Sequence, residues 1–208
     1  MKGTSHVIIG AATGFIVASY SQANPETTIA LVGIGGFSGL VPDLDIGGKL
    51  RSKLTKPHAS IRHTAQLIGL LLMVYSFLIK NDTHPYFGMG IGAVIFVLAS
   101  MFKQKHMLMI TGIGVLAGGY FLEENWVLLF GTYILMASLT PHRSYTHSLI
   151  GLVFFGIIGY QFEQSLVMEG VFYTCLLGYV SHLVADSKLV PFNKRGVPLF
   201  LPFTKTEI

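Results

Sequence analysis

The sequence predicts an all-α protein, a multi-span transmembrane bundle of about eight helices. Three observations support this prediction. The chain of 208 residues is 51% hydrophobic and only 12% charged, whereas charged residues make up about 25% of a soluble domain. Its apolar residues collect in eight segments. Its basic residues fall in alternate loops between those segments, as expected for a protein that crosses a bilayer repeatedly.

The apolar segments are short. They run roughly over 7–20, 27–42, 64–79, 86–102, 107–122, 126–141, 148–162 and 171–187. Most contain fewer than the roughly 20 residues that a helix needs to cross a bilayer, so the first two could instead be half-embedded. No linker separates the segments, and we therefore predict one membrane-embedded domain over residues 1–208.

The basic residues predict the orientation of the chain. If the N-terminus is cytoplasmic, 13 of the 14 Lys and Arg residues lie in the cytoplasmic head, 43–63, 103–106, 142–147 and the tail, and only Lys80 lies outside. The outer loops contain acidic residues instead, namely Glu26, Asp82, Glu123, Glu124, Glu163 and Glu169. Because loops rich in Lys and Arg stay on the cytoplasmic side, we predict an integral inner or plasma membrane protein with both termini in the cytoplasm.

Glycine is abundant, with 24 residues. Three pairs are spaced four residues apart and share a helix face: Gly10 and Gly14, Gly88 and Gly92, and Gly114 and Gly118. Small residues at this spacing let helices approach closely in lipid. We therefore assign these pairs to helix packing rather than to ligand binding.

Four polar motifs interrupt the apolar pattern. They are Thr4-Ser5-His6, Gly39-Leu40-Val41-Pro42-Asp43-Leu44-Asp45, Pro141-His142-Arg143-Ser144-Tyr145-Thr146-His147-Ser148 and Ser181-His182-Leu183-Val184-Ala185-Asp186. The orientation derived from Lys and Arg places all four at the cytoplasmic ends of their segments. Ionisable groups at membrane depth are costly and usually functional, so the motifs indicate a site at the cytoplasmic face of the bundle.

The residue types in these motifs favour a divalent metal. Imidazole and carboxylate ligands together suit zinc, with manganese and iron as alternatives, better than calcium. His182 and Asp186 are four residues apart and share a helix face. Pro42 favours a turn from which Asp43 and Asp45 can both point inward. We predict six ligands for one or two ions: His6, Asp43, Asp45, His147, His182 and Asp186.

Each motif alone also has a purely structural explanation. His6 could simply cap or pack a helix start. Asp43 and Asp45 could form a turn and a helix cap, and His182 with Asp186 could be an intrahelical pair. The metal hypothesis depends on the convergence of independent motifs at one face. We assign the remaining histidines to loops and interfaces: His58, His63, His84 and His106.

Together the motifs resemble those of the YdjM family of membrane-bound metal-dependent hydrolases. The shared pattern is an N-terminal His, Pro-Asp-x-Asp after the second apolar segment, His-Arg-x-x-Thr-His-Ser, Gly-Tyr-x-Ser-His-x-x-x-Asp, and Gly-Val-Pro-Leu. The corresponding residues here are His6, 42–45, 142–148, 178–186 and 196–199. The stretch 46–135 matches less well, and we interpret it as an insertion of extra spans.

The resemblance implies a reaction. The family is distantly similar to the zinc-dependent phospholipase C and P1 nuclease group, which implies that metal-activated water cleaves a phosphoester, including one in a lipid. Arg143 would then grip the phosphate through its planar guanidinium, and His142 would protonate the leaving group. The expected partners are the lipid bilayer and a phospholipid or other phosphoester substrate, with no direct binding of nucleic acid.

The alternative is a protein without catalytic activity, either a metal-binding membrane regulator or a transporter. A transporter would need polar groups near the bilayer midplane or along both halves of a path. The middle segments contain almost no charge, and the outer loops lack a matching His and Asp cluster. These features favour an enzyme or a regulator over a transporter.

Overall fold

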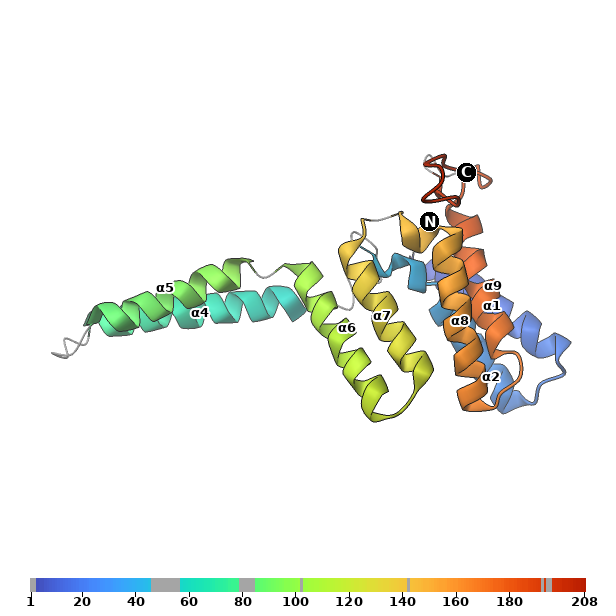
Figure 1. Ribbon diagram of the computed structural model, residues 1–208, viewed down its shortest axis with the longest axis horizontal. Coiled ribbons are helices and arrows are strands. Elements are labelled where there is room, and N and C mark those ends of the chain that lie inside the picture. The colour runs from blue at the N-terminus through green and yellow to red at the C-terminus, as the bar shows by residue number, and fades with distance from the viewer. Residues whose placement is uncertain are drawn as a thin grey trace. The chain divides into compact units, whose positions relative to one another are not determined.

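The computed structural model describes residues 3–45, 57–78, 85–101, 103–141, 143–191, 193 and 196–208. Within these ranges the chain is all-α, with eight α-helices, two short 3-10 helices and no β-strand (Figure 1). The packing of Cα atoms divides the chain into two compact units. The first comprises Met1–Arg51 and Leu108–Ile208, and the second comprises Ser52–Met107.

The first unit contains most of the secondary structure. Its α-helices are α1 (Gly3–Tyr20), α2 (Pro25–Ser38), the greater part of α6 (Gln104–Phe121), α7 (Asn125–Leu139), α8 (Leu149–Leu166) and α9 (Val171–Asp186). Its 3-10 helices are η1 (Val41–Leu44) and η2 (Tyr145–His147). Helix α9 packs against α1, α2 and α8, α1 packs against α2, and α7 packs on α8.

Side chains at the helix ends explain where two of these helices begin. Asn24 caps α2, because its Oδ1 atom accepts a hydrogen bond of 2.8 Å from the backbone N–H of Thr27, and Pro25 occupies the first helical position. Both features are typical of helix starts. At the start of α9, the Oε2 atom of Glu163 accepts a hydrogen bond of 2.8 Å from the N–H of Phe172. Glu163 lies on α8, so this bond also joins α8 to α9.

Glycine brings α1 and α2 into close contact, as the spacing of Gly10 and Gly14 predicts. A Cβ atom on Gly10 would collide with the backbone carbonyl of Gly35, and one on Gly14 would collide with the carbonyl of Leu31. For α6 the prediction identified the wrong glycines. A Cβ atom on Gly114 or Gly118 would meet nothing within 4 Å, whereas Gly112 and Gly119 contact α7. Helix α6 therefore packs on α7 through the face that carries Gly112 and Gly119, and not through the face that carries Gly114 and Gly118.

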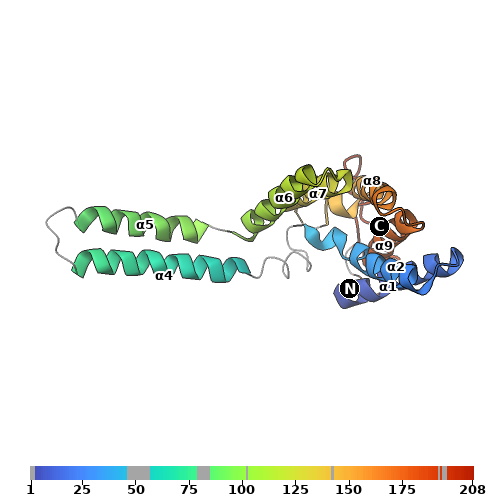
Figure 2. The ribbon, with the colours of Figure 1, turned by 90° about the horizontal axis from the view of Figure 1, so that it is seen from below.

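The second unit is a helical hairpin of α4 (Pro57–Leu78) and α5 (Pro85–Met101), which run side by side (Figure 2). The two helices approach closely where Gly92 faces Gly69 and Met73, and Gly88 faces Ser76. Most of the large apolar side chains of the hairpin are exposed, for example Leu67 and Phe77. Residues 46–135 were expected as the insertion. The second unit covers only Ser52–Met107 of this stretch, because α6 beyond Met107 and all of α7 belong to the first unit.

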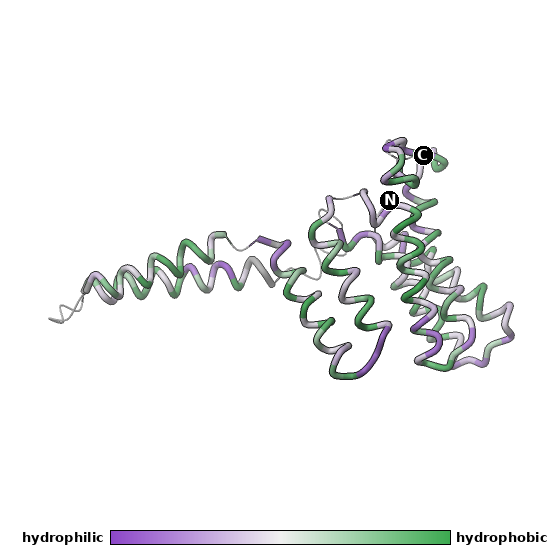
Figure 3. Tube along the Cα trace, viewed as in Figure 1, coloured by the Kyte–Doolittle hydropathy of each residue, from purple (hydrophilic) through white to green (hydrophobic). Residues whose placement is uncertain are grey.

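The helices correspond to the eight predicted apolar segments, but few have the length and apolarity of a membrane span. Among the described residues, α8 alone meets both criteria, and α5 with α6 would add a second span if the pair is counted as one broken span. Helices α2 and α7 contain only 14 and 15 residues. At a rise of about 1.5 Å per residue, such helices are shorter than the roughly 30 Å hydrocarbon core of a bilayer. Figure 3 shows hydrophobic residues along the helices, interspersed with less hydrophobic ones.

Candidate metal centre

The six predicted ligands come together at one end of the first unit. His6 lies near the start of α1, Asp43 lies on η1, and His147 ends η2. His182 and Asp186 lie in the last turns of α9. Together with Asp45, which follows η1, all six are at most 4% exposed. The structure therefore joins four sequence motifs into one buried polar cluster.

Three of these residues form a first ligand group on α1 and α9. His6, His182 and Asp186 each offer one ligand atom, and these atoms lie within 4.8 Å of one another. The Nε2 atom of His6 is 3.3 Å from Asp186 Oδ1. The imidazole rings of His6 and His182 stack with their centroids 3.9 Å apart. A single ion between these atoms could contact all three side chains.

A second ligand group adds the two 3-10 helices. Asp43, His147 and His182 also offer ligand atoms within 4.8 Å of one another. The Nε2 atom of His182 is 3.3 Å from His147 Nε2 and 3.9 Å from Asp43 Oδ1. The two groups share His182, so they are adjacent parts of one centre.

The backbone fixes which nitrogen of His182 faces the cluster. The Nδ1 atom of His182 is 2.7 Å from the carbonyl oxygen of Gly39. A carbonyl oxygen only accepts hydrogen bonds, so Nδ1 carries the proton and Nε2 keeps its lone pair. That lone pair can serve one ion. If two ions bind, only one of them can have His182 as a ligand.

Asp45 belongs to neither ligand group and supports the cluster from beside His147. Its Oδ2 atom accepts hydrogen bonds from Thr146 Oγ1 at 2.6 Å and from the backbone N–H of Arg143 at 3.0 Å. The same atom is 3.2 Å from His147 Nδ1. A carboxylate in this position orients a metal-binding histidine and leaves its Nε2 atom for the ion.

Of the two residues predicted to act on the substrate, the structure describes Arg143 but not His142. Arg143 is about one-fifth exposed, and its Nη2 atom is 3.1 Å from Asp186 Oδ2. Its Nη1 atom donates to the carbonyl oxygen of Gly196 at 3.4 Å. Its backbone has a positive φ of 58°, and its N–H donates to Asp45 Oδ2. His142 lies outside the described residues.

Several groups that support the cluster were not predicted from the sequence. The carbonyl of Gly39 could not be anticipated, because a backbone atom leaves no signature in a sequence. Thr146 and Tyr179 both lie inside the motifs but received no role. The hydroxyl of Tyr179 donates to the carbonyl of Thr146, and it lies 3.0 Å from the hydroxyl of Tyr133. These bonds connect α7 and α9 to η2, which carries His147.

The donor set is suited to a metal. A divalent metal binds neutral imidazole nitrogens and ionised carboxylate oxygens, and the cluster contains both kinds of side chain,. The Nδ1 atom of His6 is buried and has no hydrogen-bond partner among the described residues, which is unusual for a buried polar atom. Imidazole and carboxylate together favour zinc, manganese or iron. The two groups could thus hold a metal ion.

Comparisons with known proteins agree with the motifs. The family described as "YdjM inner membrane protein" matches residues 1–208, which is the whole chain. Searches of curated proteins and of solved structures found no match. The similarity to the phospholipase C and P1 nuclease group therefore remains an expectation from the motifs. With its full length matched and its His and Asp motifs gathered in one centre, the chain belongs to the YdjM inner membrane protein family.

Proposed function

We propose that the protein is a membrane-bound hydrolase that uses a divalent metal to cleave phosphoesters, including those of lipids. The observation that carries this proposal is the convergence of two overlapping ligand groups on His182. Burying ionisable groups costs free energy unless they are paired or bind a metal, and ionisable groups at membrane depth usually serve a function. His and Asp side chains commonly hold the metal ions that activate water for hydrolysis.

In this proposal the ion is held by His6, His182 and Asp186, with Asp43 and His147 completing the centre. A bound divalent ion would supply an activated water and would stabilise negative charge on the phosphoryl oxygens. The protein keeps the ligands in place, because Gly39 fixes the ring of His182 and Asp45 fixes the ring of His147. This support holds the donor atoms close to one another before the substrate arrives.

Arg143 is the proposed phosphate-binding residue. Its guanidinium is partly exposed and adjoins the cluster through Asp186. The two hydrogen bonds to Asp186 and Gly196 leave further N–H groups of the guanidinium for a ligand,. A planar donor pair matches two phosphate oxygens better than an ammonium does. Protonation of the leaving group by His142 remains a prediction from the sequence.

We also propose that the helices cross the membrane with the metal centre on the cytoplasmic side. The turns that carry acidic residues gather at the other end of α8 from His147. Ser165 Oγ donates to Glu124 Oε2 at 2.8 Å, and a hollow of about 300 Å³ is lined by both Asn24 and Glu169. Figure 3 shows the turn between α6 and α7 as hydrophilic.

This orientation can be tested by cysteine labelling in intact cells. Single cysteines at positions 24, 82, 124 and 165 should react with an impermeant thiol reagent from outside. The native Cys175 is buried and provides the background control. Protection of two or more of these positions would contradict the proposed topology.

The catalytic proposal is tested by metal analysis of the purified protein together with a hydrolysis screen. We expect one or two zinc, manganese or iron ions per chain, and cleavage of phosphomonoesters or phosphodiesters that stops after chelation and returns with metal. Absence of bound metal under all loading conditions would contradict the proposal. Full metal occupancy without hydrolysis of any phosphoester would instead support a metal-binding regulator.

A further inference from the structure

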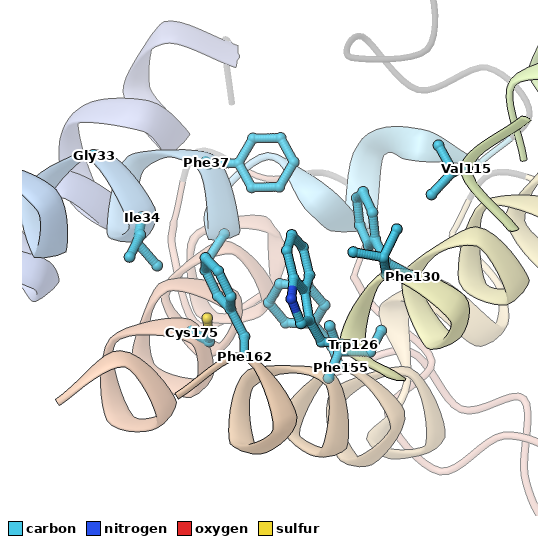
Figure 4. A pocket seen from close by; sticks show the side chains of 12 residues that line it. Gly33, Ile34, Phe37, Val115, Trp126, Phe130, Phe155, Phe162 and Cys175 are labelled. Carbon is cyan, nitrogen blue, oxygen red and sulfur yellow. The ribbon is translucent and has the colours of Figure 1, made fainter. Parts of the chain in front are cut away.

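Two apolar hollows differ in what their walls offer to a ligand. The first unit contains a pocket of about 440 Å³ that is lined by aromatic rings such as Trp126 and Phe155 (Figure 4). No charged side chain among the described residues lines it, so it has no group that would select one apolar molecule over another. The α4–α5 hairpin contains a groove of about 320 Å³ whose wall includes an arginine, Arg62. This groove therefore combines an apolar wall with a positive charge.

The groove lies between the two helices of the hairpin. It is lined by side chains from the first half of α4 and the last half of α5, namely Ile61, Arg62, Ala65, Ile95, Leu98 and Ala99. Because α4 and α5 run side by side in opposite directions, these halves lie at the same end of the hairpin (Figure 2). Ile61 is 47% exposed and Leu98 is 62% exposed, so the apolar wall of the groove is accessible from outside.

Arg62 has little negative charge near it in its own unit. Between Ser52 and Met107 the sequence contains six Lys and Arg residues and one acidic residue, Asp82. Asp82 follows the far end of α4 at Leu78, which is about 24 Å along the helix axis from Arg62. The Nε atom of Arg62 is buried and has no hydrogen-bond partner among the described residues. A buried donor without a partner costs free energy, so the guanidinium would gain from an anionic ligand.

The surface around the groove has the same order of charge and hydrocarbon as a phospholipid. Lys103 and Lys105, which follow the end of α5, are exposed and add positive charge at this end of the hairpin. Farther along the hairpin, exposed side chains are apolar, for example Leu71 and Ile91. Basic residues beside an apolar membrane surface attract anionic headgroups. The chain belongs to a family of inner membrane proteins, so such lipids are its natural surroundings.

We infer that the groove of the hairpin binds one anionic phospholipid, with the phosphate at Arg62 and an acyl chain between Ala65 and Ile95. The guanidinium carries paired donors that match two phosphate oxygens. A free phosphate would lack the hydrocarbon contacts, and a zwitterionic lipid would lack the net negative charge. The inference is independent of the proposed hydrolysis, because every residue of the groove belongs to the second unit and none to the candidate metal centre.

A tryptophan placed in the groove would report the lipid that occupies it. Trp126 is the only Trp of the chain, so the full-length double variant Trp126→Phe, Leu98→Trp has its one indole at the groove. We would reconstitute it in vesicles of phosphatidylcholine and phosphatidylglycerol, with dibrominated acyl chains on one of the two lipids, because bromine quenches tryptophan fluorescence on contact. We expect a preference for phosphatidylglycerol of about fivefold at equal mole fraction, as for one Arg beside an anionic headgroup.

Matched variants separate a site at the groove from general attraction to a charged surface. Arg62→Gln in the same background should abolish the preference for phosphatidylglycerol. Lys105→Gln is the control, since it also removes one positive charge from this unit but Lys105 does not line the groove. It should keep the preference. Glycerol phosphate, which carries the phosphate without the hydrocarbon, should not compete with the lipid.

If the double variant fails to fold, native mass spectrometry of the protein with its own Trp126 can count retained phosphatidylglycerol molecules. Arg62→Gln should then retain one fewer than the wild type and Lys105→Gln the same number. Equal quenching by both lipids, or no retained phosphatidylglycerol, would overturn the inference. An equal loss in Arg62→Gln and Lys105→Gln would show attraction to the charged surface alone. Displacement by glycerol phosphate would assign Arg62 to a soluble phosphate compound instead.

Discussion

The candidate metal centre and the α4–α5 hairpin both contain histidine but use it differently. His6, His147 and His182 are at most 1% exposed and contact one another or an aspartate. His63 on α4 is exposed. The hairpin joins two helices that are neighbours in the sequence, whereas the centre joins segments from both ends of the chain. The difference shows that burial by several distant elements, and not the presence of histidine, creates the candidate site.

The largest expected effect is on metal affinity, which should fall on mutation of the cluster but not of the hairpin. His182→Ala removes the only residue common to both ligand groups, and it should lower metal affinity more than about 100-fold. His63→Ala, the matched control in the hairpin, should leave metal affinity unchanged. Metal titration of the two purified variants measures both values. Equal affinities would mean that the centre has no special role in metal binding.

A smaller effect is expected for Asp45→Asn. The amide can still accept a hydrogen bond from Thr146, but it loses the charge that orients His147. Removing such a supporting carboxylate typically lowers metal affinity about 10–100-fold. The same titration decides between two roles. A loss as large as that of His182→Ala would make Asp45 a direct ligand, as the sequence predicted, and no loss would exclude both roles.

Arg143→Lys should affect the reaction and spare the metal. Lysine retains the positive charge near Asp186 but lacks the paired donors of the guanidinium. We expect unchanged metal content and a fall in kcat/KM of about tenfold or more for phosphoesters, as for the loss of one charged hydrogen bond. Steady-state kinetics with a metal assay on the same sample provide the test. Wild-type kinetics would exclude Arg143 from phosphate binding.

The smallest expected effect is on the free energy of unfolding, when one glycine in each region is replaced by alanine. Gly10→Ala would drive a Cβ atom into the carbonyl of Gly35, and such overpacking costs about 1 kcal/mol or more. Gly90→Ala in α5 meets nothing within 4 Å and should stabilise its helix by about 0.5–1 kcal/mol. Thermal unfolding in detergent measures both. Equal stability changes would contradict the close contact between α1 and α2.

The positions of the helices and the membership of the candidate centre largely followed from the sequence. Apolar runs predict helices because helix formation depends on local hydrogen bonds and burial of nearby side chains. His182 and Asp186 could be paired from their spacing of four residues. Asp43 and His147 could be grouped only through the charge pattern of the loops, which placed their motifs at the same end of the bundle.

Other features depend on contacts between distant segments. The role of Asp45 beside His147, the carbonyl of Gly39 behind His182, and the packing of Gly112 rather than Gly114 could not be read from local patterns. The apolar pocket is another case, because its walls come from helices far apart in the chain. Chain composition thus specifies helices and ligand chemistry, since both depend on residue type and short-range spacing. Ring orientation, supporting bonds and cavities arise only when distant surfaces meet, since no single segment contains the atoms on both sides.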